Sequence, residues 1–303
     1  MTINPPRLYL IDASIYIFRA YFSLPAHWHS PCGYPVNAVF GYSRFLLDFL
    51  EQVQPGEVVA AFDESLGQSF RHQLFPDYKA SRVLPDDMLA FQLAACKTMT
   101  KSLGITTVAR QRYEADDIIA SLAIRARAAG KSFTVLTRDK DLGQLLTGAD
   151  EYWWNFSDQI SLDGAGFAER FGVRPDQFAD FLALVGDSVD DIPGVPGVGE
   201  KTAVALLRHF DNLDTLFDQL ANVGDLSLRG ARRIQQRLGE YEAQVRLARQ
   251  LTGLATNVPK LPAPERCVWR VPDTASVARA CERFGLGSAL GRRVANSPCL
   301  RNA

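Results

Sequence analysis

Four aspartates follow short apolar runs in the first half of the chain, either directly or within a few residues. The runs cover residues 8–11, 58–62 and 133–136, and the aspartates behind them are Asp12, Asp63, Asp139 and Asp141. Such runs are typical of strands buried on both faces of a sheet. The carboxyl ends of parallel strands meet at one edge of an open sheet, and ligands bind at that edge. The sequence therefore predicts that these carboxylates lie close together.

Two further groups of acids extend the set. One lies in YEADDIIA, just before and within the first turn of a predicted helix, and the other lies in VGDSVDDIPG, which is too acidic for a simple turn. Their members are Glu114, Asp116, Asp117, Asp187, Asp190 and Asp191. Any one of these acids could be a helix cap, a turn residue or part of a solvated surface. As a converging set they would repel one another, and they would need cations.

The predicted ligand set consists of oxygen donors without His or Cys. Such a set suits Mg²⁺ or Mn²⁺. Two such ions a few ångströms apart can activate a water and hold both oxygens of an in-line phosphodiester displacement. Hydrolysis of a phosphate ester is the chemistry that this pattern indicates.

A glycine-rich stretch, IPGVPGVGEKTAVALL, follows the acidic loop. Its glycines are Gly194, Gly197 and Gly199, and the residues after them are Glu200, Lys201 and Thr202. A nucleotide-binding P-loop needs Gly directly before Lys and a strand before the loop, so the intervening Glu200 argues against an NTPase. A helix-hairpin-helix fits better, because glycines let the backbone approach a phosphate that N–H groups at the next helix N-terminus bind. Such an element grips a nucleic-acid backbone without reading its bases.

Basic residues alternate with aromatic ones in FRHQLFPDYKASR, residues 70–82. The basic residues are Arg71, His72, Lys79 and Arg82, and the aromatic ones are Phe70, Phe75 and Tyr78. This mixture can hold phosphates and stack on unpaired bases, although a structural role explains His72 more simply. A second basic series has helical spacing, and a solvated helix face explains it equally well. Its members are Arg229, Arg232, Arg233 and Arg237.

The elements that position these residues fall into two kinds. Helical patterns at residues 39–53 and 116–129 alternate with the apolar runs, which indicates an α/β domain with a largely parallel sheet. From about residue 175 the strand pattern disappears, and short helices with Gly-rich turns are predicted at 202–210, 213–220 and 228–250. We expect three parts: a catalytic domain over 1–175, a helical DNA-binding subdomain over 176–257, and an extension over 258–303 with a possible helix at 274–284.

Composition narrows the class of protein. The 303 residues include 33 Lys and Arg, 34 Asp and Glu and 47% hydrophobic residues, which excludes disorder, collagen and disulfide scaffolds. The five cysteines have no C-x-x-C spacing, so no zinc or redox site is predicted. The N-terminus lacks a long apolar segment and no stretch is long enough to span a bilayer, so we expect a cytoplasmic protein without membrane contact.

Taken in order, these motifs resemble the 5′ nuclease (flap endonuclease) superfamily, in particular the 5′-3′ exonuclease domain of bacterial DNA polymerase I and its stand-alone relatives. The resemblance covers about residues 7–255 and rests on LIDASIYIFRAYF, GYPVNAVFGY, AAFDESLGQSFRHQLFPDYKASR, YEADDIIA, TRDKDL and VGDSVDDIPGVPGVGEKTA. It implies a PIN-like α/β nuclease core with a helical arch over the active site, and a helix-three-turn-helix element that binds duplex DNA. The implied enzyme cuts DNA near single-strand/duplex junctions such as 5′ flaps, leaves 5′-phosphate and 3′-hydroxyl ends, and needs no nucleotide cofactor. We expect a monomer.

The resemblance also implies the roles of individual residues. The implied metal ligands are Asp12, Asp63, Glu114, Asp116, Asp117, Asp139, Asp141, Asp187 and Asp190. Asp191 is left out, because relatives commonly have Asn there. Lys79 and Arg82 match a basic pair near the scissile phosphate. The implied DNA contacts are Arg19, Tyr21, Arg71, Gly197, Val198, Gly199, Glu200, Lys201 and Thr202. Relatives also bind K⁺ through backbone carbonyls, which here would be those of Leu184, Val185, Pro193, Val195 and Val198.

The sequence departs from the family pattern at two places. Arg138 stands where a small residue is commoner, and the arch segment, residues 83–105, is short. Two alternatives stay open. A nuclease of the same fold could act mainly on RNA, which the sequence does not separate from DNA. A structure-specific DNA-binding protein with a silent site would lack several acids, and this chain retains the full set.

Overall fold

The computed structural model describes residues 7–65, 67–82 and 85–300. Its centre is a six-stranded sheet in the order β3-β2-β1-β4-β5-β6, parallel except for β6, which runs antiparallel to β5. The strands are β1 (Arg7–Asp12), β2 (Glu57–Asp63), β3 (Thr106–Arg110), β4 (Ser132–Leu136), β5 (Glu151–Asn155) and β6 (Ile160–Leu162). The three strands expected from apolar runs are present, and they are adjacent in the sheet. The α/β class with a largely parallel sheet is confirmed.

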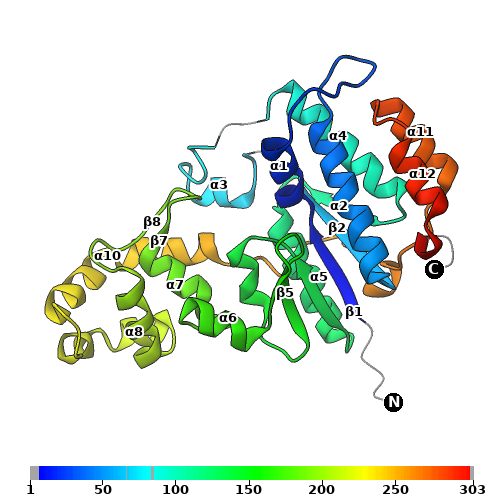
Figure 1. The fold of residues 1–303 in the computed structure, drawn as a ribbon. Coiled ribbons are helices and arrows are strands. Elements are labelled where there is room, and N and C mark those ends of the chain that lie inside the picture. Colours follow the sequence, from blue (N-terminus) through cyan, green and yellow to red (C-terminus); the bar gives the residue numbers. More distant parts are fainter. Residues whose placement is uncertain (1–6, 66, 83–84, 301–303) are drawn as a thin grey trace.

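Both faces of the sheet are buried, as the continuous apolar runs predict. Residues of β2 alternate between two cores: Val59 and Ala61 face one, whereas Val58, Ala60 and Phe62 face the other. Helix α5 (Ala115–Ala128) covers the first face. The second face carries α1 (Ala13–Ser23), α2 (Asn37–Val53) and α4 (Asp87–Ser102) (Figure 1).

A helical subdomain lies beside the β5–β6 side of the sheet (Figure 1). Its helices are α6 (Gly164–Phe171), α7 (Phe178–Val185), α8 (Glu200–Phe210), α9 (Leu213–Asp218) and α10 (Ala231–Thr252). The helices expected from the sequence here are confirmed. The loss of strand structure after residue 175 needs one correction, because two-residue strands β7 (Gly186–Asp187) and β8 (Ile192–Pro193) pair across the acidic loop.

The segment after α10 returns to the domain that contains the six-stranded sheet. Trp269 is buried, and its indole N–H donates to the Leu103 carbonyl at 2.9 Å. Two helices, α11 (Thr274–Phe284) and α12 (Ala289–Asn296), then pack beside α4 and α2 (Figure 1). The expected helix at 274–284 is confirmed, whereas α12 was not expected.

Shorter elements complete the chain. They are α3 (Phe70–Leu74) and the 3₁₀ turns η1 (Lys140–Leu145), η2 (Pro175–Gln177), η3 (Leu220–Asp225), η4 (Pro264–Arg266) and η5 (Pro298–Leu300). Residues 83 and 84 of the expected arch segment lie outside the described residues. Within the described ranges, every helix is too short or too polar to cross a membrane.

Candidate active site

Asp12 and Asp63 stand at the carboxyl ends of neighbouring strands. Asp12 is the last residue of β1 and is 4% exposed. It caps α1 by accepting from the Ile15 N–H at 3.3 Å. Asp63 ends β2, and its Oδ1 accepts from both the N–H and the hydroxyl of Ser65, at 2.8 and 2.7 Å. Each carboxylate is therefore held in a fixed orientation at the sheet edge.

Thr137 links the acids that follow β4 to Asp12. Its hydroxyl donates to Asp12 Oδ2 at 2.9 Å and accepts from the Asp139 N–H at 2.9 Å. Asp139 in turn caps η1 through the Asp141 N–H, also at 2.9 Å. We did not predict a role for Thr137 from the sequence, although it is the first residue of TRDKDL.

The first turn of α5 brings in the next acids. Glu114 is the N-cap and is 3% exposed. Asp117 is completely buried, and both of its oxygens accept hydrogen bonds from Arg71 at 2.8 Å. Arg71 itself is 3% exposed. This geometry favours a structural pair for Asp117 and Arg71 over direct contact with metal and DNA.

The loop between β7 and β8 adds Asp187 and Asp190. Lys140 donates to Asp187 Oδ2 at 2.8 Å. Arg82 donates to Asp190 Oδ1 at 2.7 Å, and Lys79 forms ion pairs with Glu114 and Asp190. The basic pair implied by the resemblance thus lies against the acids.

Tyr78 has a different position from the one the sequence suggested. Stacking on unpaired bases would need an exposed ring, but this side chain is 2% exposed. Its hydroxyl donates to Asp190 Oδ2 at 3.0 Å and lies 3.3 Å from Glu114 Oε2. Tyr78 therefore supports the acids from within the protein, and the expectation of base stacking is wrong for it.

Burial and mutual repulsion raise the pKa values of several acids. Burial and the nearby Asp139 charge raise the pKa of Asp12 and that of Asp141 to about 7. The same causes raise the pKa of Asp116 well above its usual range. Burial alone would also raise the pKa of Glu114, but the charges of Lys79 and Arg71 hold it below its ordinary value.

The donor set fits divalent cations in its chemistry. The acids supply oxygen donors alone, and Glu114 Oε1 is buried without a hydrogen-bond partner among the described residues. In the part of the chain that the structure describes, no group of three or more His, Cys, Asp or Glu side chains is already arranged to hold a metal ion. Ammonium groups of Lys79 and Lys140 lie against the carboxylates. The cluster is thus rich in negative charge, and lysines neutralise part of it.

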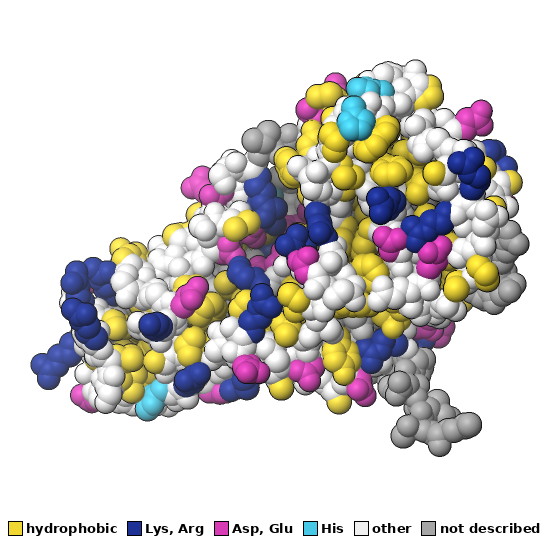
Figure 2. Space-filling model, in the orientation of Figure 1, with side chains coloured by type: hydrophobic (Ala, Val, Ile, Leu, Met, Phe, Trp, Pro, Cys, Tyr) yellow, Lys and Arg dark blue, Asp and Glu magenta, His cyan; other side chains and the backbone are white. Residues whose placement is uncertain are grey.

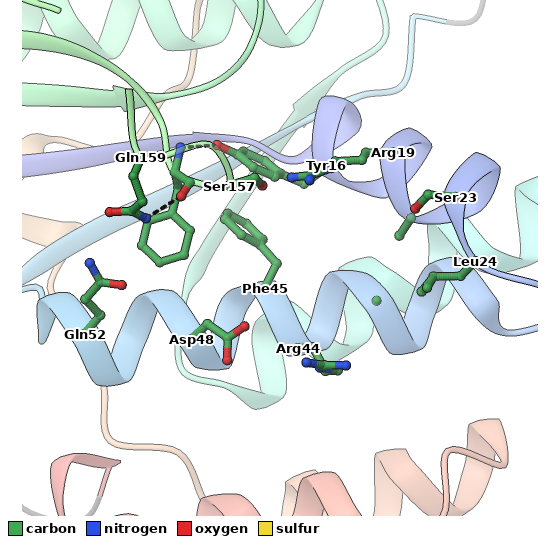
Figure 3. Close-up of a pocket in the computed structure, with 13 residues that line it drawn as sticks. Tyr16, Arg19, Ser23, Leu24, Arg44, Phe45, Asp48, Gln52, Ser157 and Gln159 are labelled. Atoms are coloured by element: carbon green, nitrogen blue, oxygen red, sulfur yellow. Dashed lines mark hydrogen bonds between the residues drawn. The ribbon is translucent and has the colours of Figure 1, made fainter. Parts of the chain in front are cut away.

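Two cavities lie near these elements. One of about 130 Å³ adjoins the acids and is lined by residues that include Asp63, Lys79, Arg82 and Glu114. Another, of about 510 Å³, lies between α1, α2 and the β5–β6 turn, away from the acids. Arg19 lines this second cavity, and Figure 3 shows it on α1, with Arg44 on α2. Tyr21 is half-buried on α1, where its carbonyl accepts from Asn37 at 2.9 Å.

The glycine-rich hairpin leads into α8. Gly197 has a φ of +85°, a conformation that favours glycine. Gly199 is the N-cap of α8, and a Cβ built there would meet nothing within 4 Å. Val198 is buried, Thr202 is half-buried, and Glu200 and Lys201 are exposed. Figure 2 shows Lys and Arg side chains gathered at the end of the helical subdomain that lies farthest from the sheet.

Three of the carbonyls expected to bind K⁺ already accept hydrogen bonds. The Leu184 carbonyl accepts from the Val195 N–H at 2.9 Å, and the Val195 carbonyl accepts from the Val198 N–H at 2.9 Å. The Pro193 carbonyl lies 3.3 Å from the Gln244 amide nitrogen. A carbonyl oxygen has two lone pairs, so these bonds leave room for a second partner.

Two family models divide the chain between them. The 5′-3′ exonuclease N-terminal resolvase-like domain matches residues 7–172, and the 5′-3′ exonuclease C-terminal SAM fold matches residues 173–275. The sheet with its acidic edge and the helical subdomain therefore define an exonuclease-type α/β domain joined to a SAM-type fold. The chain belongs to the 5′-3′ exonuclease family.

Individual relatives agree with the family models. DNA polymerase I of Pseudomonas aeruginosa is 39% identical over 252 residues, which cover 83% of this chain and 27% of the polymerase. The chain thus spans about a quarter of the length of that relative. A 5′-3′ exonuclease of Buchnera aphidicola subsp. Schizaphis graminum is 31% identical over 250 residues, covering 82% of this chain and 86% of that protein.

Solved structures show the same fold. The D15 protein of T5, co-crystallised with metal ions, superposes with a TM-score of 0.67 at 19% identity and covers 95% of this chain and 96% of its own. The catalytic core of Rad2 in complex with DNA substrate gives a TM-score of 0.64 at 17% identity, covering 97% of this chain and 92% of its own.

Proposed function

We propose that this protein is a divalent-metal-dependent 5′ nuclease that hydrolyses DNA phosphodiesters near single-strand/duplex junctions and leaves 5′-phosphate and 3′-hydroxyl ends. The observation that carries the proposal is the convergence of acids from β1, β2, η1, α5 and the β7–β8 loop beside Lys79 and Arg82. Family membership supports the same chemistry. We further propose that it acts as a monomer in the cytoplasm.

Eight acids are proposed as metal ligands. They are Asp12, Asp63, Glu114, Asp116, Asp139, Asp141, Asp187 and Asp190. Bound there, two Mg²⁺ or Mn²⁺ ions would supply an activated water and hold both oxygens of an in-line displacement. Asp117 is assigned instead to fixing the first turn of α5, because Arg71 occupies both of its oxygens.

Lys79 and Arg82 are proposed to contact the reacting phosphate. Both line the 130 Å³ cavity beside Asp63 and Glu114. A fixed positive charge there stabilises the negative charge that develops on phosphate oxygens during hydrolysis. On substrate binding, these side chains would exchange their carboxylate partners for the phosphate.

The hairpin from Gly194 to Thr202 is proposed to hold the duplex arm of the substrate. The open space at Gly199 and the N–H groups at the start of α8 suit a phosphate. K⁺ bound by the neighbouring carbonyls would strengthen that grip. Binding through phosphates would make the protein select DNA shape over base sequence.

Cleavage of an end-labelled 5′-flap duplex tests the proposal. We expect cuts near the junction with Mg²⁺ and none in EDTA. The matched variant is Asp139→Asn, which should lower turnover by orders of magnitude and leave DNA affinity largely intact. Full activity in EDTA or in Asp139→Asn contradicts the two-metal assignment, and a preference for the same flap made of RNA would redirect the substrate assignment.

A further inference from the structure

Arg71 stands at a joint between three parts of the molecule. It belongs to α3 and is 3% exposed. Its guanidinium donates to both oxygens of Asp117 on α5, each at 2.8 Å. It also donates to the Leu251 carbonyl at 2.8 Å and to the Gly253 carbonyl at 2.7 Å, where α10 ends. One buried side chain therefore connects α3, α5 and α10.

Asp117 extends this joint toward the acids. Its Oδ2 accepts from the Glu114 N–H at 3.2 Å, and its Oδ1 accepts from the Ala255 N–H at 2.9 Å. Arg71 Nη1 lies 3.7 Å from Glu114 Oε1. The backbone of a proposed metal ligand and the chain behind α10 are thus fixed by the same pair of charges.

The first half and the middle of α10 contact the glycine-rich hairpin. Arg237 donates to the Pro196 carbonyl, and Gln244 donates to the Gly194 carbonyl at 3.2 Å. Arg237 and Gln244 lie 14 and 7 residues before Leu251, which corresponds to about 21 and 10 Å along the helix at 1.5 Å per residue. A single helix therefore connects the hairpin that is proposed to hold the DNA with the carbonyls that Arg71 contacts.

We infer that Arg71 is a positioning residue that fixes the hairpin relative to Glu114 and so determines which phosphodiester is cut. This inference rests on the proposed nuclease function. If the end of α10 loosens, DNA held by the hairpin shifts relative to the acids, and a misplacement of about 1 Å lowers the rate by about 100-fold. Lys cannot replace Arg71, because an ammonium lacks the planar fork that serves a carboxylate and two carbonyls together.

The test compares Arg71→Lys with Arg249→Lys. Arg249 lies on the same helix and pairs with Asp180 of α7, so it is a matched control within the helical subdomain. Single-turnover cleavage of an end-labelled 5′-flap duplex with Mg²⁺ is resolved to one nucleotide. Arg71→Lys should spread the product over neighbouring positions and slow cleavage by about 10- to 100-fold. Arg249→Lys should keep the wild-type product pattern.

A second variant approaches the joint from α5. Asp117→Asn removes the partner of Arg71, so it should give the same spread of products. Combining the two changes should cost little more than either alone, because both break one unit. Circular dichroism and thermal melting establish that each variant is folded.

Several outcomes would overturn the inference. These are an unchanged product pattern in folded Arg71→Lys, an equal spread in Arg249→Lys, or fully additive effects in the double variant. Unfolding of both Arg71→Lys and Asp117→Asn would show that the pair serves folding and not position. Absence of cleavage by the wild-type protein would instead refute the proposed function on which the inference rests.

Discussion

The acids at the sheet edge are held together against their own repulsion. Because Asp12 and Asp141 have pKa values of about 7, the folded protein keeps protons that the unfolded chain releases from about pH 4 upward. Folding stability without metal therefore falls as pH rises from about 4 to 7. We predict that the Tm in EDTA is several degrees lower at pH 8 than at pH 5.5, and that Mg²⁺ restores it at pH 8. Calorimetry measures both.

Asp116→Asn is the control for this pH effect. It removes one ionisable group whose pKa burial and the Asp139 charge raise in the folded protein, so the Tm in EDTA should depend less on pH and respond less to Mg²⁺. A Tm in EDTA that rises from pH 5.5 to pH 8 in the wild-type protein would contradict the assignment of repulsion.

Lys79 and Arg82 should act mainly on the chemical step. Removal of one fixed charge that stabilises a developing oxyanion costs about 10²- to 10³-fold in rate. We predict losses of this size for Lys79→Ala and Arg82→Ala in single-turnover cleavage at saturating DNA, with a smaller effect on DNA affinity. Unchanged single-turnover rates together with weaker binding would make both residues ordinary backbone contacts.

For single residues, the sequence predicts where a side chain lies better than it predicts which groups that side chain contacts. The positions of Asp12 and Asp63 follow from apolar runs, because strand ends meet at one sheet edge. The burial of Arg71 and Tyr78 could not be read in the same way. Both belong to a segment rich in basic and aromatic residues, and they are buried by groups far away in sequence, among them Asp117 for Arg71 and Asp190 for Tyr78.

The role of the glycine-rich hairpin in DNA binding can be tested with a single substitution. Gly199→Val places its side chain in space that the protein leaves open, so folding should survive and approach to a phosphate should be blocked. Junction affinity should fall by at least about tenfold, which corresponds to about 1.4 kcal/mol. Fluorescence anisotropy across a salt series measures it, beside cleavage of a short single strand.

Lys201→Ala is the companion variant for the hairpin. It should weaken binding for all sequences alike and reduce the salt slope by about one unit. Loss of single-strand cleavage with intact junction affinity in Gly199→Val would place the hairpin in the active site instead. Gly197 is a poorer choice, since its positive φ strains any side chain there.

Helices and strands with a strong hydrophobic pattern were predictable from the sequence, and those with a weak pattern were not. The pattern over 39–53 gave α2, and the buried run 58–62 gave β2. The sequence did not predict strand β3, because its residues are mostly half-buried and include a terminal Arg110. The two-residue strands β7 and β8 form through pairing across the acidic loop, which no local pattern records.

The C-terminal segment that packs back against the sheet domain contributes to the stability of the whole molecule. Trp269 is buried against the catalytic domain. We predict that Trp269→Ala lowers the free energy of unfolding by about 3–5 kcal/mol, because a large cavity remains. Val271→Ala, at a site that is 41% exposed, should cost under about 0.5 kcal/mol. Denaturant titration measures both, and equal effects would show that the segment is only loosely attached.

The same segment constrains the order in which the protein assembles during synthesis. Val268 pairs with Glu57 at the start of β2, and Arg293 bonds to Asp48 on α2 at 2.7 Å. These contacts join parts of the chain that leave the ribosome more than 200 residues apart. At about 5–20 residues per second, α2 and β2 wait at least about ten seconds for these partners. The catalytic domain therefore leaves the ribosome first but completes its packing last. Part of its apolar surface is exposed in the interval.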